Sequence, residues 1–190
     1  MKTENYFETI KCEDYEIHNL IYHSNRISNT IALNINLQDY IYPTSNKLLK
    51  CKVIYNNEGV LDVQYTSYKK RDIKTFKIIF DDKIEYSKKS IDRNNLNELF
   101  KRKDNCDEII IIKNGIVYDT SIANIAILHE GIWITSKSCL LKGTTRARYI
   151  NNNLLIEKDI SIEMLKKASK IALMNAMIDF DEITNYSLYF

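Results

Sequence analysis

Two apolar runs on either side of an Asn-Gly pair constrain the fold of this chain more than any other feature. The runs cover residues 109–112 and 116–118 and flank Asn114-Gly115 in the stretch CDEIIIIKNGIVYDTSIANIAIL. Asn-Gly between β-rich runs is the strongest short-range hairpin signal, because both residues accept the positive φ of a tight turn. The first run is apolar on both faces, which is typical of a strand in the interior of a sheet.

Asp119 is a candidate site residue because it interrupts this apolar region. The second run leads into Asp119-Thr120-Ser121, and the chain becomes apolar again at residues 122–128. A carboxylate between two buried segments is unfavourable unless a positive group meets it. The alternative is that Asp119 bonds its own backbone in a turn.

Composition indicates a globular chain and gives no argument for a nucleic-acid or membrane partner. A chain of 190 residues can bury a sizeable core, and 45% hydrophobic with 27% charged content is ordinary for a globular protein. The 27 basic and 25 acidic residues leave a net charge of +2, too small to indicate binding to nucleic acid or an anionic membrane. No apolar run approaches the roughly 20 residues that a membrane helix needs.

The cysteines and the first residues indicate a cytoplasmic protein without a metal site. The cysteines at positions 12, 51, 106 and 139 form no CxxC pair, and no histidine lies at a ligand spacing from them. We therefore expect reduced, unpaired thiols. The opening sequence MKTENYFETIKCEDYE has no apolar signal-peptide core, so we expect a cytoplasmic location.

Strand and helix patterns predict an α/β (α+β) fold in two lobes. Strand-like runs fall at residues 7–12, 48–55, 60–68, 73–80 and 170–174. Helices are predicted at residues 21–36, 92–103 and 161–168 and directly after Gly143. Because Asp81-Asp82 interrupts the apolar pattern, we place the boundary there, between a small N-terminal α+β lobe (1–82) and a larger C-terminal α/β lobe (83–190). The tail, 179–190, is acidic and then aromatic.

Six short motifs occur in the order found in one enzyme family. They are FETI at 7–10, HSNR at 23–26, KSIDR at 89–93, DE at 107–108 followed by DTSIAN at 119–124, LKGTTR at 141–146, and NA at 175–176. This series resembles the class IV aminotransferases, which are pyridoxal-phosphate enzymes of fold type IV. The resemblance implies the two-lobed D-amino-acid-aminotransferase-like fold. The hairpin that normally precedes FETI in the family is missing, which implies a truncated N-terminal lobe.

The resemblance also implies roles for individual residues around pyridoxal 5'-phosphate. Lys89 would be the catalytic lysine that bonds to the cofactor, and Asp119, where most of the family has glutamate, would face its ring nitrogen. Arg26 would bind the phosphate in a bidentate manner. The remaining cofactor contacts implied are Asn124, Thr144, Thr145 and Asn175. The two threonines follow a glycine at a predicted helix start, where free N–H groups suit an anion.

Within the family, the resemblance is closest to short members of the 4-amino-4-deoxychorismate lyase type, which release 4-aminobenzoate and pyruvate in folate synthesis. Arg93, Arg146 or Arg148 would then bind substrate carboxylates, and the sequence does not choose among them. Two alternatives stay open: an amino-acid aminotransferase of branched-chain or D-amino-acid type, and a binding protein that has kept the fold without the cofactor. The family resemblance also implies a homodimer.

Overall fold

The computed structural model describes residues 4–190, and the chain divides into two compact units. The first unit contains the residues up to Lys70 together with Lys88–Asp92, and the second contains Arg71–Ser87 and Arg93–Phe190. Both combine strands with a few helices, as the predicted mixed α/β class requires. The division after Lys70 differs from the boundary predicted after residue 82. The reason is that strand β5 (Thr75–Phe80) pairs in parallel with β6 (Glu108–Lys113) of the second unit.

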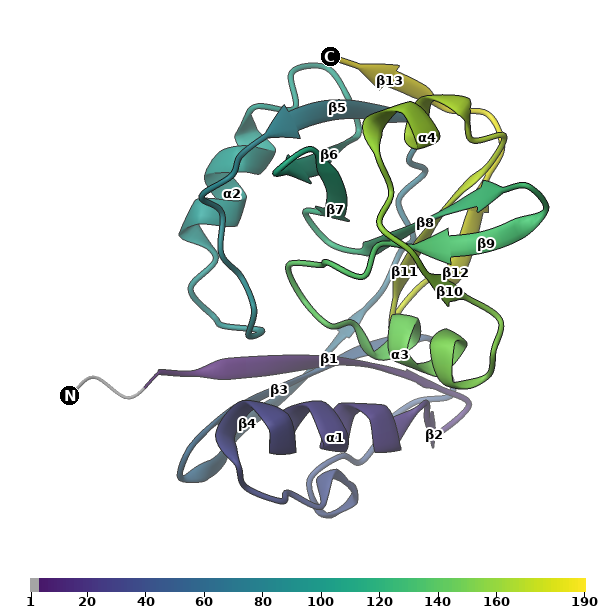
Figure 1. Cartoon of the computed structure of the whole chain (residues 1–190). Coiled ribbons are helices and arrows are strands. Elements are labelled where there is room, and N and C mark those ends of the chain that lie inside the picture. Colours follow the sequence, from purple (N-terminus) through teal and green to yellow (C-terminus); the bar gives the residue numbers. More distant parts are fainter. Residues whose placement is uncertain (1–3) are drawn as a thin grey trace. The chain divides into compact units, whose positions relative to one another are not determined.

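The first unit is an antiparallel sheet with a helix along one face. Its described strands have the order β2-β1-β3-β4, and α1 lies along them in Figure 1. The elements are β1 (Tyr6–Glu13), β2 (Glu16–Ile17), α1 (Leu20–Ile31), the 3-10 helix η1 (Leu37–Asp39), β3 (Leu49–Asn56) and β4 (Gly59–Ser67). Helix α1 stops five residues before the predicted end at 36 because Ala32 adopts a left-handed conformation with φ 54°.

Strand β1 alternates between a buried and a half-exposed face. Tyr6, Ile10 and Cys12 point into the core that also contains Ile27 of α1. Glu8 belongs to the same inward series, so its carboxylate lies in an apolar layer. Residues 88–92 run beside the start of β1, where the Phe7 N–H donates to the Lys89 carbonyl at 2.9 Å.

The second unit is built on a mixed sheet with the described order β10-β9-β8-β7-β6-β5-β13, to which β11 and β12 attach through β8. Its further elements are α2 (Asn94–Lys101), β7 (Ile116–Thr120), β8 (Asn124–His129), β9 (Ile132–Thr135), α3 (Thr144–Asn151), β10 (Ile156–Glu157), α4 (Ile162–Lys167), β11 (Ile171–Asn175), β12 (Asp179–Ile183) and β13 (Ser187–Tyr189). Helix α2 contacts β6, α3 contacts β11 and α4 contacts β7.

The predicted central hairpin is confirmed. Strands β6 and β7 pair around Asn114 and Gly115, which have φ values of 51° and 76°. The run 109–112 is buried on both faces: Ile110 and Ile112 belong to one core cluster, whereas Ile109 and Ile111 belong to another, with Leu96 and Leu99 of α2. Strand β6 is therefore the interior strand that its sequence predicts.

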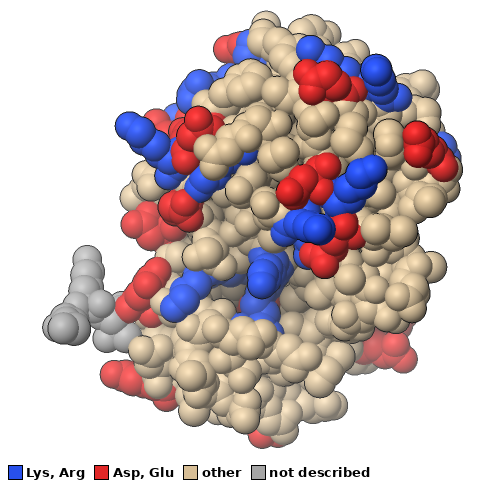
Figure 2. All heavy atoms as spheres, in the orientation of Figure 1, with Lys and Arg blue, Asp and Glu red and all other residues tan. Residues whose placement is uncertain are grey.

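No helix within residues 4–190 is both long and apolar enough to cross a membrane. On the visible face of the second unit, Figure 2 shows acidic and basic side chains interspersed, as the small net charge suggests.

We predict that Gly115→Ala lowers the free energy of unfolding by about 1–2 kcal/mol, the usual cost of placing a Cβ in the left-handed region. A Cβ at Gly115 would meet no atom within 4 Å, so backbone strain alone is tested. Gly115→Asn is the matched control and should lose much less, because asparagine tolerates this region. Urea denaturation measures both. Equal stability of Gly115→Ala and the parent would contradict the turn assignment.

Candidate active site

In the first unit, the fully buried carboxylate of Glu8 binds Arg26, the residue of this unit predicted to bind the phosphate, and also His23. Its Oε1 accepts a hydrogen bond from Nε of Arg26 at 2.8 Å, and its Oε2 accepts bonds from Nη2 of Arg26 and Nδ1 of His23, the latter at 2.6 Å. Burial alone would raise the pKa of Glu8, but the Arg26 charge and the bonds from His23 and Arg26 lower this pKa to about 2. Glu8 is therefore ionised and fixes the orientation of Arg26.

His23 completes this cluster as a neutral ring. Because Glu8 is ionised, the proton of the shared bond lies on Nδ1 of His23. Burial lowers the pKa of His23, although Glu8 opposes the shift. Among the described residues, its buried Nε2 has no hydrogen-bond partner. The pair with Glu8 uses the Nε–H and an Nη2–H donor of Arg26, so the guanidinium is held in a fixed orientation.

Lys89 lies in the same unit as Arg26. It is half-buried, and its Nζ lies 4.7 Å from the centroid of the Phe7 ring, whereas the exposed Lys88 lies over Tyr6. The charge of Lys89 contributes to the lowered pKa of His23, so these groups are close enough to interact. The structure therefore distinguishes the two neighbouring lysines, and Lys89 is the less exposed.

In the second unit, the carboxylate of Asp119 is 4% exposed and held by three N–H donors. Oδ1 accepts from Nδ2 of Asn124 at 2.7 Å, and Oδ2 accepts from the backbone N–H groups of Leu140 and Leu141 at 2.9 and 3.0 Å. Burial raises the pKa of Asp119 to about 6, although these bonds and the Arg146 charge oppose the rise. The alternative that Asp119 bonds its own turn is wrong; Thr120 does so, accepting from the Ala123 N–H at 2.9 Å.

Asn124 joins Asp119 to the start of α3. Its Nδ2 also donates to the Leu141 carbonyl at 2.8 Å. A Cβ on Gly143 would lie 2.0 Å from Oδ1 of Asn124, so only glycine fits there. Thr144 and Thr145 follow, both buried, and begin α3. The first N–H groups of a helix have no partner within the helix, so this close-packed turn suits an anion.

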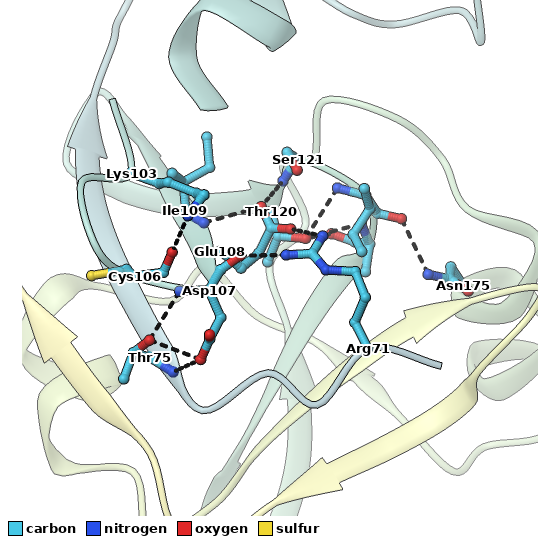
Figure 3. A network of polar contacts seen from close by, with 12 residues as sticks. Arg71, Thr75, Lys103, Cys106, Asp107, Glu108, Ile109, Thr120, Ser121 and Asn175 are labelled. Atoms are coloured by element: carbon cyan, nitrogen blue, oxygen red, sulfur yellow. Dashed lines mark hydrogen bonds and ion pairs between the residues drawn. The ribbon is translucent and has the colours of Figure 1, made fainter. Parts of the chain in front are cut away.

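Charged side chains hold the turn that follows Asp119 (Figure 3). Glu108 is fully buried; its Oε1 accepts from the Ser121 N–H at 3.2 Å, and its Oε2 accepts from Nη1 of Arg71 at 3.0 Å. Nη2 of Arg93 donates to the Ser121 carbonyl at 2.7 Å. At the far side of the turn, Nδ2 of Asn175 donates to the Ile122 carbonyl at 3.3 Å. The turn is thus fixed by the side chains of three residues.

The sequence interpretation assigned no site role to Glu8, Glu108 or Arg71. The two glutamates stand inside the FETI and DE motifs, so the motifs themselves were the available signal. Arg71 carries no such signal, because its partner Glu108 is 37 residues away.

The arginines predicted to bind substrate all have partners within the second unit. Arg93 bonds Ser121, as described above. The buried Arg146 donates to the Ser136 carbonyl at 2.8 Å and to Glu157 at 2.5 Å, and Arg148 pairs with Asp179. Their substrate role stays a prediction.

The donor set fits pyridoxal phosphate in chemical type. Lys89 offers an amine and Arg26 a guanidinium, and the start of α3 offers backbone N–H groups in a turn that a Cβ would fill. Asp119 offers a carboxylate whose Oδ1 accepts one bond from the protein, which leaves capacity for a ring N–H. Near neutral pH most of this carboxylate is ionised, because its pKa is about 6.

Comparison with known proteins shows which family the chain belongs to. The profile of the family described as Amino-transferase class IV matches residues 87–186. An uncharacterised protein of Haemophilus influenzae is 35% identical over 182 residues, covering 90% of this chain and 96% of that protein. The chain therefore belongs to the class IV aminotransferase family.

Solved structures agree and confirm the predicted fold type IV. A structure from Haemophilus somnus 129PT, assigned provisionally as a 4-amino-4-deoxychorismate lyase, is 34% identical, with a TM-score of 0.85 and coverage of 93% of this chain and 98% of that one. A hypothetical aminotransferase from Mycobacterium tuberculosis in its PLP-bound form has a TM-score of 0.77 at 13% identity, covering 98% of this chain and 82% of that one. The latter likeness shows the fold alone.

We predict that Glu8→Gln lowers the free energy of unfolding by roughly 3 kcal/mol at pH 7. The pKa of Glu8 is lowered from 4.5 to about 2, so its stabilisation is present above pH 4.5 and is lost as the pH falls towards 2. Urea denaturation at a series of pH values should show the difference from the parent shrinking across this window. Glu13→Gln, on the same strand but paired with Lys11 at the surface, should change little. A difference independent of pH would contradict the Glu8–Arg26 account.

We also predict that Gly143→Ala destabilises the second unit, because the new methyl group displaces Asn124 from Asp119. Urea denaturation of Gly143→Ala, Asn124→Ala and the double variant forms a double-mutant cycle. The double variant should lose less stability than the sum of the single changes, because the clash disappears with the Asn124 side chain. Additive losses would show that the clash lies elsewhere.

Proposed function

We propose that the protein is a pyridoxal-phosphate-dependent lyase that converts 4-amino-4-deoxychorismate to 4-aminobenzoate and pyruvate. The main support is the end-to-end similarity, at 34% identity, to the Haemophilus somnus structure provisionally assigned to this activity. The KSIDR motif around Lys89 and the paired Asp119 and Asn124 supply the residue types that the chemistry needs.

In this proposal, each residue takes the role that the family resemblance implies for a bound cofactor. Lys89 would bond to the aldehyde carbon of the cofactor, and Arg26 and the start of α3 at Thr144 and Thr145 would bind its phosphate. Asp119, oriented by Asn124, would meet the ring nitrogen, and Asn175 supports the neighbouring turn at Ile122. When bound, the cofactor supplies an electron sink for the pair left by removal of a proton.

Lys89 carries the proton transfers of the proposed reaction. Once the substrate amine has replaced Lys89 on the cofactor, the freed neutral Nζ would take the proton from the substrate carbon that bears the amino nitrogen. The carbon–oxygen bond to the enolpyruvyl group then breaks with its electron pair on oxygen, and the ring becomes aromatic. Nζ returns the proton to the methylene carbon of the departing group, which leaves as pyruvate. Atoms and charge balance without an added oxidant or water.

Asp119 must keep its charge while this happens. A carboxylate beside the ring nitrogen stabilises the protonated nitrogen, and the three N–H donors around Asp119 hold it in place. For the substrate carboxylates we propose Arg93 first among the three arginines, because its contact with Ser121 places it at the turn beside Asp119.

Two further elements belong to the proposal. A homodimer is the assembly that the family resemblance implies, and sedimentation at micromolar concentration tests it. A cytoplasmic location suits the four cysteines, which are unpaired in the structure, because free thiols persist in a reducing compartment.

We predict that the purified protein, supplied with pyridoxal phosphate, releases pyruvate and 4-aminobenzoate in equal amounts from 4-amino-4-deoxychorismate. Lys89→Ala should lose at least about 100-fold in rate, because the group that moves the proton is gone. Lys88→Ala is the matched control and should keep the parent rate. Lactate dehydrogenase coupling measures pyruvate.

Other outcomes would contradict the lyase proposal in recognisable ways. No pyruvate, together with conversion of the cofactor to its amine form when an amino acid is added, would indicate an aminotransferase. No spectral change on adding the cofactor would indicate a binding protein that has kept only the fold.

A further inference from the structure

Two lysine ammonium groups share one aromatic ring in the first unit. Nζ of Lys89 lies 4.7 Å from the centroid of the Phe7 ring, and Nζ of Lys52 lies 5.2 Å from the same centroid. Because both distances end at one point, the two nitrogens can be no further apart than their sum, about 10 Å. That separation is within the range at which charges interact at moderate salt.

The backbone register produces this arrangement. Phe7 and Thr9 lie on the half-exposed face of β1, and Lys52 of β3 is directly opposite Thr9, so it is the diagonal neighbour of Phe7. Lys89 reaches the same ring because its carbonyl accepts the Phe7 N–H at 2.9 Å. Both lysines are half-buried, which limits the screening of their charges.

The charge of Lys52 disfavours a second positive charge at Lys89. A lysine is nucleophilic only when neutral, and its ordinary pKa of about 10.4 leaves few neutral molecules at pH 7. A unit charge at about 10 Å changes that pKa by between about 0.3 and 1, depending on the effective dielectric constant. The Phe7 ring attracts both ammonium groups. Because the ring is unchanged when Lys52 alone is replaced, its attraction for Lys89 is the same in the parent and in the variant.

Other charged groups also lie around Lys89, but they stay the same when Lys52 alone is changed. On α1, Arg26 adds positive charge and His23 is neutral. On β1, Glu8 is negative, and its carboxylate accepts hydrogen bonds from both of these residues. Lys88 and Asp92 flank Lys89 on its own segment. On β4, Asp62 pairs with Ile54, next to Lys52, and its Oδ2 accepts a bond from Nε2 of Gln64 at 2.7 Å.

We propose that Lys52 is a positioning residue that acts through its charge, so that the amine of Lys89 loses its proton more readily and attacks the aldehyde of the cofactor faster. The benefit to the reaction rests on the proposed function, but the charge interaction between Lys52 and Lys89 can be measured without cofactor.

Competitive acetylation with trace acetic anhydride over a range of pH, followed by peptide mass spectrometry, measures the proton affinity of Lys89 in the cofactor-free protein. In Lys52→Met, the titration midpoint of Lys89 should rise by between about 0.3 and 1 pH unit, that is, two- to tenfold less neutral amine at pH 7. Lys52→Gln should give the same rise. Lys52→Arg keeps the charge and should keep the midpoint.

Lys50→Met is the matched control, because Lys50 is a half-buried lysine on the same strand and face, two residues away. An unchanged midpoint in both Lys52→Met and Lys52→Gln, or an equal rise in Lys50→Met, would overturn the proposal. A lyase assay run in parallel distinguishes the role of Lys52 from the proposed reaction. Lyase activity without a rise of the Lys89 midpoint in Lys52→Met overturns only the role of Lys52. A rise of that midpoint without lyase activity overturns only the proposed reaction.

Discussion

The second unit depends on one buried carboxylate, that of Asp119. Its three hydrogen bonds join the end of β7 to the first residue of β8 and to the loop before α3. A carboxylate in an apolar interior is tolerated only when such donors surround it. As a result, the acid and the start of α3 form one connected assembly, and Gly143 lets the helix approach closely enough to complete it.

The two units shift the pKa values of their buried carboxylates in opposite directions. Glu8 meets the guanidinium of Arg26, and its pKa is lowered to about 2, so it is a fixed charge that orients a cation. Asp119 meets only neutral donors directly, and burial raises its pKa to about 6, so a positive charge placed beside it would favour its ionised form. Environments that separate the pKa values of two acids commonly separate their roles as well.

Local patterns predicted the elements better than their assembly. The hairpin at Asn114 and Gly115 was correct because turn chemistry is local. The boundary after residue 82 differed, because β5 belongs with β6 through a parallel pairing that no local pattern reveals. Strands β12 and β13 were not predicted. Strand β12 lies in the acidic part of the tail and has no apolar run, although it pairs with the adjacent β11, whereas the partner of β13 is the remote strand β5. The candidate site residues were predicted from the order of the family motifs. These motifs include Asp119 and Asn124, but Arg71 stands in none of them, so its contacts were not predicted.

The proposed function requires that the amine of Lys89 bonds to pyridoxal phosphate. Reduction with borohydride after addition of the cofactor makes such a bond permanent, and peptide mass spectrometry then locates the modified lysine. We expect one pyridoxyl group on Lys89, retained in Lys88→Ala and absent in Lys89→Ala. Label on another lysine in the parent protein, or none at all under conditions in which the cofactor is in excess, would contradict it.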